Sequence, residues 1–369
     1  MNILKRIFKP KIKYISGVLE DVRPPEEKKK DFLTEEILVS GFPLNWITWE
    51  NWKVKPENIK MLNDIKVHNQ RGVGSCAAES GSLALAINNY LEDGVFYKFS
   101  SKPIYARRKN KPSVGMYMAD LADICRTFGT LFETLYPSPN DTEANMSNLD
   151  GYISAFEGVA KLLRAKNYFW LYQVNDIDSF AQILSIGKPI VLTVIFGDGE
   201  FDTIAPDVKP VQPKYGHAIV TLPNAYFTYQ GKKAILIQNS WGDYRYYGGR
   251  QILTEDWFLK NRILYGIWFS DIHNLEIFNQ VDSSLPKYQW TRDLTIGSIG
   301  DDVRMLQIVL SMIQDDDGFL FPLFNQNPTG QFYGLSRSAV KRFQLKYGIE
   351  PPEGYFGIKT RAKLNSMCK

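Results

Sequence analysis

The chain has 369 residues, of which 44% are hydrophobic, 14% aromatic and 23% charged, and its formal net charge is +4. This composition excludes disordered, collagen-like and coiled-coil chains, and the length exceeds what one hydrophobic core usually supports, so we expect two domains. No stretch approaches the roughly 18 consecutive apolar residues of a membrane span, and the start lacks the apolar run of a secretory signal. We therefore expect cytoplasmic synthesis without a signal peptide, and no membrane span.

Residues 1–42 form a basic N-terminal arm without a sustained helical or strand period. Residues 1–30 hold nine Lys and Arg residues against four acidic residues, a charge of +5, which leaves −1 for residues 31–369. The folded part therefore has no basic bias, and this argues against an enzyme that acts on nucleic acid. Two interpretations of the arm stay open: a solvated tail, or a segment that docks on an acidic surface.

Helical patterns come next in chain order. Apolar residues at three-to-four spacing predict a helix from Cys76 through Leu91, and a second helix fits residues 118–128. Short runs rich in β-branched residues then predict strands at 189–196, 217–222 and 234–238. Helices first and strands second indicate an α+β domain over residues 43–280, with a helical half, an antiparallel sheet half and a cleft between them.

The remaining sequence predicts a linker and a small second domain. Polar residues at 281–290 mark the linker, and the pattern beyond it is helical to the end. Glycines precede several of these helical stretches, where they let the backbone turn into a helix. We therefore expect residues 291–369 to form an all-α module of three helices, with Asp302 in a capping position.

Three cysteines are too few for a disulfide framework or a thiolate metal site. We expect Cys125 and Cys368 to have structural or incidental roles. His68 and His273 have no companion ligands at metal spacing, so we predict no metal site and no cofactor. Any special cysteine in this chain is then a nucleophile, and Cys76 is the candidate.

Cys76 follows a glycine-rich loop and begins the first predicted helix. A cysteine at a helix N-terminus experiences the partial positive charge of unpaired backbone N–H groups, which favours the thiolate. The thiolate needs a base that also protonates a leaving amine near neutral pH, and His217 at the start of a predicted strand fits this role. Asn239 follows the next strand, so a strand pair would bring it to the second ring nitrogen of His217.

These residues resemble the papain family of cysteine peptidases, and the resemblance covers about residues 43–272. It implies that Cys76 is the nucleophile, that His217 acts as base and then acid, and that Asn239 orients the imidazole. It also implies that Gln70, together with the backbone N–H of Cys76, donates to the oxyanion. Trp241 resembles the indole that covers the Asn–His contact, and the resemblance implies that Gly74, Gly115 and Gly216 line the substrate site.

Two departures from the family pattern bear on activity. The chain has Ala77-Ala78-Glu79 where members usually have Trp-Ala-Phe, and Val73 where they usually have a cysteine. The structural disulfides of the family are therefore absent, as fits a protein folded in the cytosol. An active enzyme and a degenerate, inactive one both stay open.

Residues 291–369 resemble the peptidoglycan-binding domain type 1 of bacterial and phage wall hydrolases. Most of the matching residues are helix-start glycines and core positions, so they are structural. The resemblance implies a wall ligand held by polar and aromatic groups, for which Tyr333, Tyr355 and Arg337 are the candidates. The insertion at 315–327 departs from the compact pattern of this domain.

Together the two resemblances imply a cysteine endopeptidase that its module carries to the bacterial cell wall, as a phage lysin, a virion component or a wall peptidase. It would cleave peptide or protein substrates at the wall. The alternatives are an assembly-processing peptidase and a catalytically inactive structural or binding protein of a phage or bacterium. Because residues 1–42 are shorter than the pro-segments of the papain family and lack a long amphipathic helix, we expect the arm not to block the cleft.

Overall fold

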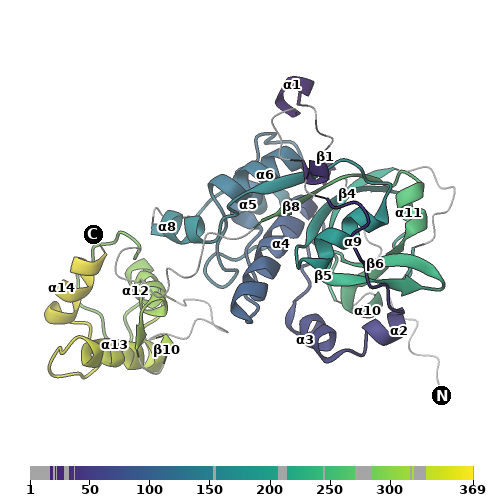
Figure 1. The fold of residues 1–369 in the computed structure, drawn as a ribbon. Helices are drawn as coiled ribbons and strands as arrows, with labels where there is room; N and C mark the ends of the chain where they lie inside the picture. Colours follow the sequence, from purple (N-terminus) through teal and green to yellow (C-terminus); the bar gives the residue numbers. More distant parts are fainter. Residues whose placement is uncertain are drawn as a thin grey trace, which may run out of the picture.

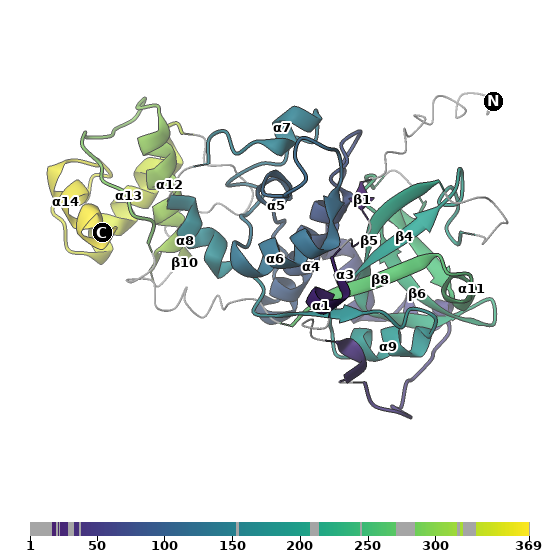
Figure 2. The same cartoon turned by 90° about the horizontal axis from the view of Figure 1, so that it is seen from above.

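The computed structural model describes residues 17–19, 21, 23–28, 33–36, 38–152, 155–206, 214–243, 246–270, 285–315, 318–319 and 330–368. Figures 1 and 2 show a helical lobe, a sheet lobe beside it, and a small helical module that lies next to α8 (Ala155–Leu162), on the side of the helical lobe away from the sheet. In the part of the chain that the structure describes, no helix combines the length and apolar character needed to cross a bilayer.

The helical lobe is built around one long buried helix, α4 (Cys76–Asp93). All residues of α4 up to Tyr90 are buried, because the sequence supplies small and apolar side chains on every face. The helix ends at Gly94, whose φ of 73° closes the last turn with a hydrogen bond to the carbonyl of Tyr90. The predicted helix is confirmed. The other elements of this lobe are α3 (Pro56–Asp64), α5 (Lys102–Ala106), β2 (Met116–Tyr117), α6 (Met118–Thr127), α7 (Glu143–Ser147) and α8.

The second predicted helix is confirmed as α6, and the sequence explains where it stops. Gly129 follows with a φ of 71°, and a Cβ at this position would lie 2.0 Å from the carbonyl oxygen of Ala160 in α8. Only glycine allows this close approach. On the same helix Cys125 is fully buried, as predicted for a structural cysteine, whereas Phe128, which follows the helix, is 41% exposed.

The sheet lobe is a six-stranded sheet in the order β3-β8-β4-β5-β6-β7, with antiparallel pairing throughout. Its strands are β3 (Tyr168–Leu171), β4 (Ile190–Phe196), β5 (Tyr215–Tyr229), β6 (Lys232–Gln238), β7 (Arg250–Thr254) and β8 (Ile263–Phe269). The three predicted strands are β4, β5 and β6. Helix α9 (Ile177–Ser185) packs on one face, α4 contacts β5 from the helical lobe, and α10 (Tyr246–Gly249) and α11 (Glu255–Leu259) flank β7.

Strand β5 contributes side chains to the hydrophobic cores of both lobes, because successive side chains point to opposite faces of the sheet. Ala218 and Val220 join the apolar cluster that contains α4, whereas Ile219 joins the cluster that contains α9. A strand buried on both faces reads as a continuous apolar run, as this one does. The strand therefore fixes the helical lobe to the sheet at the point where His217 lies.

The described residues of the N-terminal arm include β1 (Val18–Leu19), α1 (Pro25–Lys28) and the short 3₁₀ helix η1 (Thr34–Glu36). Helix α2 (Trp49–Trp52) follows after the arm. Strand β1 pairs in parallel with β2 of the helical lobe. Further along, Oε1 of Glu35 accepts hydrogen bonds from the backbone N–H groups of Tyr172 and Gln173. The interpretation of the arm as a solvated tail is therefore wrong for residues 17–19 and 33–36, whereas α1 has no buried residue, and residues 1–16 lie outside the described part of the chain.

The module contains three helices, as predicted: α12 (Asp301–Met312), α13 (Gly334–Lys346) and α14 (Ile358–Met367), with a short hairpin of β9 (Gln314–Asp315) and β10 (Gly318–Phe319). Trp290, which we expected in the linker, is buried against the module, and its backbone N–H and carbonyl both bond to the side chain of Asn365. Asp302 does not cap α12; it lies in the first turn and binds Arg292. Residues 281–284, and most of the predicted insertion, lie outside the described residues.

Candidate active site

Cys76 is the first residue of α4 and is fully buried where the helical lobe meets the sheet. Its Sγ accepts a hydrogen bond from the backbone N–H of Ala218 on β5, at 3.4 Å. Burial raises the pKa of the Cys76 thiol to about 12, although N–H groups of Ala218 and Ala77 act in the opposite direction. In this covered state the sulfur is therefore a neutral thiol, and not the thiolate that the helix start alone would favour.

His217 precedes Ala218 on β5 and is paired with Asn239. Its Nε2 lies 2.8 Å from Oδ1 of Asn239, which comes directly after β6. Strands β5 and β6 pair Val220 with Gln238, so the predicted strand pair is confirmed. The indole of Trp241 stacks on the imidazole with ring centroids 4.6 Å apart. Burial lowers the pKa of His217 to about 4, although the contact with Asn239 raises it.

Gln70 is buried in the loop before Cys76, and both ends of its side-chain amide are held. Its Nε2 donates to the carbonyl of Val73 at 2.9 Å, and its Oε1 accepts the hydroxyl hydrogen of Ser240 at 2.5 Å. The backbone N–H of Gln70 also donates to the carbonyl of Ser240. Since Ser240 follows Asn239, these contacts bring Gln70 to the segment that orients His217. The structure therefore gathers Gln70, Cys76, His217 and Asn239 at one junction between the lobes.

The cleft over this junction is occupied by the chain itself, through the cleft segment, residues 17–19. The backbone N–H of Gly17 donates to the carbonyl of Gly216 at 3.3 Å, and its carbonyl accepts the N–H of Met116 at 3.0 Å. A Cβ on Gly17 would lie 2.6 Å from Sγ of Cys76 and 2.9 Å from the carbonyl oxygen of Gly74. These separations are shorter than non-bonded atoms allow, so the position directly over the sulfur accepts glycine alone.

The glycines predicted to line a substrate site therefore contact the arm. Gly74 and Gly216 approach Gly17 as described, and a Cβ on Gly115, where φ is 88°, would lie 3.3 Å from the carbonyl oxygen of Gly17. Trp241, the fourth predicted residue, contacts His217 instead. Three of the four predicted substrate positions thus surround an extended backbone segment, which is the shape in which a peptide substrate would bind.

Our expectation that the arm leaves the cleft open is wrong. An arm shorter than a long helical pro-segment still covers Cys76, because three residues of extended backbone are enough to fill the space over the sulfur. Side chains after the cleft segment hold it in place. The hydroxyl of Tyr265 donates to the carbonyl of Leu19, and Arg23 pairs with Asp21 at 2.9 Å while it lies over the ring of Trp170.

One half-buried carboxylate, that of Glu143, joins the two glycine loops of the cleft, and no sequence pattern pointed to it. Oε2 of Glu143 accepts the N–H of Gly74 at 3.2 Å, and Oε1 accepts the hydroxyl hydrogen of Tyr105 at 2.6 Å. The same hydroxyl oxygen accepts the N–H of Gly115 at 3.0 Å. Arg108, which is buried, neutralises the carboxylate at 2.9 Å. Glu143 and Tyr105 thus fix the wall of the cleft against which the cleft segment lies.

Other candidate positions lie away from this junction. Burial raises the pKa of the Cys368 thiol to about 12 and also raises that of Cys125, and unlike Cys76 neither lies at a helix N-terminus. Within the described ranges, no group of three or more His, Cys, Asp and Glu side chains is placed to hold a metal ion, and His273 lies outside those ranges. In the module Tyr333 is 52% exposed, Tyr355 donates to Asp293, and Nε of Arg337 donates to the carbonyl of Glu353.

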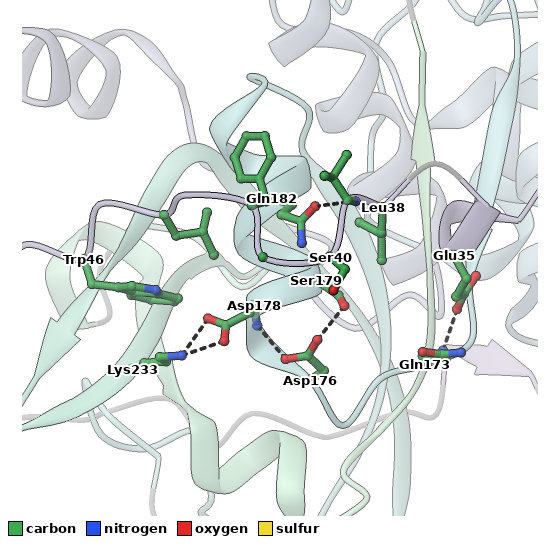
Figure 3. Close-up of a pocket in the computed structure, with 14 residues that line it drawn as sticks. Glu35, Leu38, Ser40, Trp46, Gln173, Asp176, Asp178, Ser179, Gln182 and Lys233 are labelled. Carbon is green, nitrogen blue, oxygen red and sulfur yellow. Dashed lines mark hydrogen bonds and ion pairs between the residues drawn. The ribbon is translucent and has the colours of Figure 1, made fainter.

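Figure 3 shows an open pocket of about 570 Å³ between residues 35–46 of the chain and α9. Among its polar side chains, Lys233 binds Asp178 at 2.6 Å, and Oε1 of Gln182 accepts the backbone N–H of Val39 at 3.0 Å. None of the predicted site residues lines it. The pocket marks where residues 38–46 cross α9.

Comparisons with known proteins agree with this architecture. Residues 299–364 match the family model of a peptidoglycan binding domain. The structure is similar to xylellain, a cysteine protease from Xylella fastidiosa, with 15% identity and a TM-score of 0.54, over 72% of this chain and 99% of that chain. Procathepsin B S9 from Trypanosoma congolense is similar at 13% identity and a TM-score of 0.49, over 69% of this chain and 86% of that one. No curated protein sequence matches the chain.

The similarity to xylellain confirms the predicted papain-like fold of the two lobes. The family match confirms that the C-terminal helices form a module of the peptidoglycan-binding type. At 15% identity the similarity to xylellain is one of fold, so the activity of this chain has to be argued from its own side chains.

Proposed function

We propose that this chain is a cysteine endopeptidase that its C-terminal module carries to bacterial peptidoglycan. The observation that supports the activity most strongly is the combination at the lobe junction: a cysteine at a helix start, bonded to the residue after His217, with His217 held by Asn239 at 2.8 Å. A nucleophile, a base and an orienting group in this order are the requirements for thiol acyl transfer.

The proposed reaction begins with transfer of the Cys76 thiol proton to His217. Because Nε2 of His217 is bonded to Asn239, the proton moves through Nδ1. The thiolate attacks the scissile carbonyl, and the resulting oxyanion accepts hydrogen bonds from the N–H of Cys76 and from Nε2 of Gln70. His217 then gives its proton to the leaving amine, which leaves a thioester that water hydrolyses while His217 acts as base again.

This reaction requires the cleft segment to leave. Gly17 covers Sγ, and its contacts with Gly216 and Met116 use the backbone groups that an extended substrate would need. Departure of the segment removes the burial that holds the thiol neutral, so the helix start and His217 can then favour the thiolate. The covered state is thus a resting state, and substrate has to compete with a segment of the same chain.

The match of residues 299–364 to a peptidoglycan binding domain supports the cell wall as the place of action. Holding the peptidase at the wall raises the local concentration of its substrates without any new contact in the cleft. The proposed enzyme is a phage lysin, a virion component or a bacterial wall peptidase. We also propose that the five Lys and Arg residues before residue 14 contact an acidic surface.

Digestion of purified cell-wall sacculi and of a protein mixture tests this proposal. Wild type and Cys76→Ala are incubated with each substrate, and new amino termini are identified by mass spectrometry. Release of wall peptides by the wild type alone supports the wall peptidase, whereas cleavage confined to proteins favours an assembly-processing peptidase. Equal results for wild type and Cys76→Ala on both substrates would show that the fold is used for binding and not for catalysis.

Targeting is tested separately with a chain that ends at residue 284. It lacks the module but keeps both lobes, so it should hydrolyse a soluble fluorogenic peptide at the rate of the full chain. It should not sediment with sacculi, whereas the full chain should. Equal sedimentation of the two chains would show that the module does not provide the wall contact.

A further inference from the structure

A second buried histidine lies close to Cys76, outside the groups that the proposed reaction uses. Nδ1 of His68 lies 2.7 Å from Oε2 of Glu79, and the two side chains are 1% and 2% exposed. Glu79 is in the first turn of α4, three residues after Cys76. Its other oxygen, Oε1, accepts the hydroxyl hydrogen of Ser101 at 2.6 Å. Both carboxylate oxygens are therefore paired inside the protein.

The direction of the contact follows from the charge of Glu79. Burial opposes its ionisation, but the hydrogen bond and charge of His68, and then the hydrogen bond of Ser101, outweigh burial and lower the pKa of Glu79. An ionised carboxylate only accepts hydrogen bonds, so Nδ1 of His68 carries the hydrogen. Nε2 of His68 is buried and has no hydrogen-bond partner in the described part of the chain. Within that part, the orientation of the ring therefore depends on its hydrogen bond to Glu79.

This contact joins the two elements that carry the proposed oxyanion donors. Glu79 is on the helix that begins with Cys76 and its N–H. His68 is on the segment of Gln70, which runs beside the residues that follow Asn239: the carbonyl of His68 accepts the N–H of Gly242 at 3.0 Å. The covalent connection between the two elements is residues 71–75, of which Arg71 and Gly72 are exposed and the other three are buried. The amide of Gln70 is held within its own loop by Val73, and the contact of His68 with Glu79 ties that loop to the first turn of α4.

The contribution of the contact between His68 and Glu79 follows from its electrostatic effect on Cys76 and from its effect on stability. The negative charge of Glu79 raises the pKa of the Cys76 thiol, so the contact does not activate the nucleophile electrostatically. Stability is also a weak reason for it, because well-packed apolar side chains often stabilise a core as well as a buried ion pair does. A buried, hydrogen-bonded pair differs from apolar packing in being directional. Its contribution is therefore geometric.

We propose that His68 and Glu79 are a positioning pair, which holds the side-chain amide of Gln70 and the backbone N–H of Cys76 at the separation that stabilises the oxyanion. This inference rests on the proposed peptidase function. Stabilisation of an oxyanion depends on donors that are already in place about 2.7 to 3.1 Å from the oxygen, and a misplacement of about 1 Å can cost roughly 10²-fold in rate. The pair acts in the transition state, through Gln70, and touches no substrate.

The test is the hydrolysis of a fluorogenic peptide amide by the full chain, with the concentration of active sites titrated by an irreversible thiol-directed inhibitor. Glu79→Ala removes the contact and should lower kcat by about 10-fold to 100-fold, with KM changed by less than about 2-fold. Glu79→Gln keeps an oxygen for Nδ1 of His68 and should stay within about 3-fold of wild type. A rise in KM with kcat unchanged would overturn the inference, because it would place the pair in substrate binding.

A double-mutant cycle with Gln70→Ala separates positioning from general structure. If the pair acts through Gln70, Glu79→Ala should cost less than about 2-fold in the Gln70→Ala background. An equal loss in both backgrounds would overturn the proposal. If Glu79→Ala fails to fold, the double replacement of His68 and Glu79 by Leu gives the same test, because apolar side chains of similar volume keep a core stable.

A matched control is a buried ion pair in the sheet lobe, Arg262 with Glu200 at 2.9 Å. Glu200→Ala removes a carboxylate that is equally buried, and it should lower the melting temperature while kcat stays within about 2-fold. A loss of kcat as large as that of Glu79→Ala would mean that any buried pair has this effect, and would overturn the proposal. A wild type no faster than Cys76→Ala would overturn the peptidase function as well, whereas an active wild type with an unaffected Glu79→Ala would overturn this inference alone.

Discussion

The two histidines beside the cleft are equally buried but have different partners. His217 and His68 are each 1% exposed, and each has one ring nitrogen within 2.8 Å of a side-chain oxygen. For His217 this oxygen belongs to the amide of Asn239, and for His68 it belongs to the carboxylate of Glu79. The indole of Trp241 stacks on His217. Burial alone therefore does not distinguish the two rings.

The partners and the positions of the two rings both differ. An amide stays neutral at every pH, so it orients the imidazole of His217 without opposing the gain or loss of a proton. A carboxylate stabilises the hydrogen on Nδ1 of His68 and fixes the ring as a donor. A carboxylate partner does not by itself exclude proton transfer. The positions of the rings decide the proposed roles: the residue after His217 binds Sγ of Cys76, whereas Nε2 of His68 is buried and has no hydrogen-bond partner in the described part of the chain.

The largest expected effect separates the two rings directly. His217→Ala removes the base and should lower kcat by about 10³-fold or more, while His68→Ala should lower it by about 10-fold to 100-fold. Both are measured on the same fluorogenic peptide, with thermal unfolding as the check on folding. A larger loss for His68→Ala than for His217→Ala would reverse the assignment.

Gln70→Ala should have the next largest effect. It removes one of the two proposed donors to the oxyanion, so kcat should fall by about 10² to 10³ with little change in KM. Steady-state kinetics on the same peptide measure both parameters. If KM rises while kcat stays constant, Gln70 binds the ground state of the substrate and has no role in the transition state.

A smaller effect is expected from opening the cleft. The added methyl group of Gly17→Ala would overlap Sγ of Cys76 and the carbonyl oxygen of Gly74. Such overlap costs about 1 to 3 kcal/mol, so the open state should gain population and kcat/KM should rise by about 10-fold. Gly334→Ala is the control, because a Cβ there meets nothing within 4 Å. Unchanged or reduced turnover in Gly17→Ala would show that the segment does not compete with substrate.

A further expected effect is on stability, not on turnover, and depends on pH. The pKa of His217 is about 4 in the folded chain against an ordinary value of 6.5, so the unfolded chain binds the proton more readily between these values. Acidification from pH 7 to pH 5 should therefore remove about 2 kcal/mol of stability through this group. Urea unfolding at both pH values should show a shallower pH dependence for His217→Asn. Parallel behaviour of the variant and the wild type would contradict the burial of a neutral imidazole.

The sequence was sufficient for elements that local patterns specify. The glycine-rich loop before Cys76, the apolar spacing of the helix after it, and the strand pair of His217 and Asn239 all depend on residues close in sequence. The three helices of the module could be predicted from the sequence for the same reason. A sequence signal for Glu79 was also present, because it is the only charged residue of α4 before Glu92, and a charge in a helix buried on every face requires a partner.

Tertiary contacts explain what the sequence did not predict. Nothing in the residues around Gly17 indicates that it lies over a sulfur, since this depends on β1 pairing with a strand about a hundred residues later. The partner of Glu79 lies before the loop and not on the helix. Asp302 was expected to cap a helix, but Arg292 competes for its carboxylate. In each case a contact between distant residues outweighed the local preference.

The role of Cys76 is tested most directly by alkylating the Gly17→Ala chain with limiting iodoacetamide and comparing residual peptide hydrolysis with the modification of each cysteine by mass spectrometry. Activity should fall in proportion to modification of Cys76 and reach zero at one equivalent, while Cys125 and Cys368, which are buried and do not lie at a helix N-terminus, should stay unmodified. Activity that persists when Cys76 is fully modified, or that is lost with Cys125 or Cys368 instead, would contradict the assignment of Cys76 as the nucleophile.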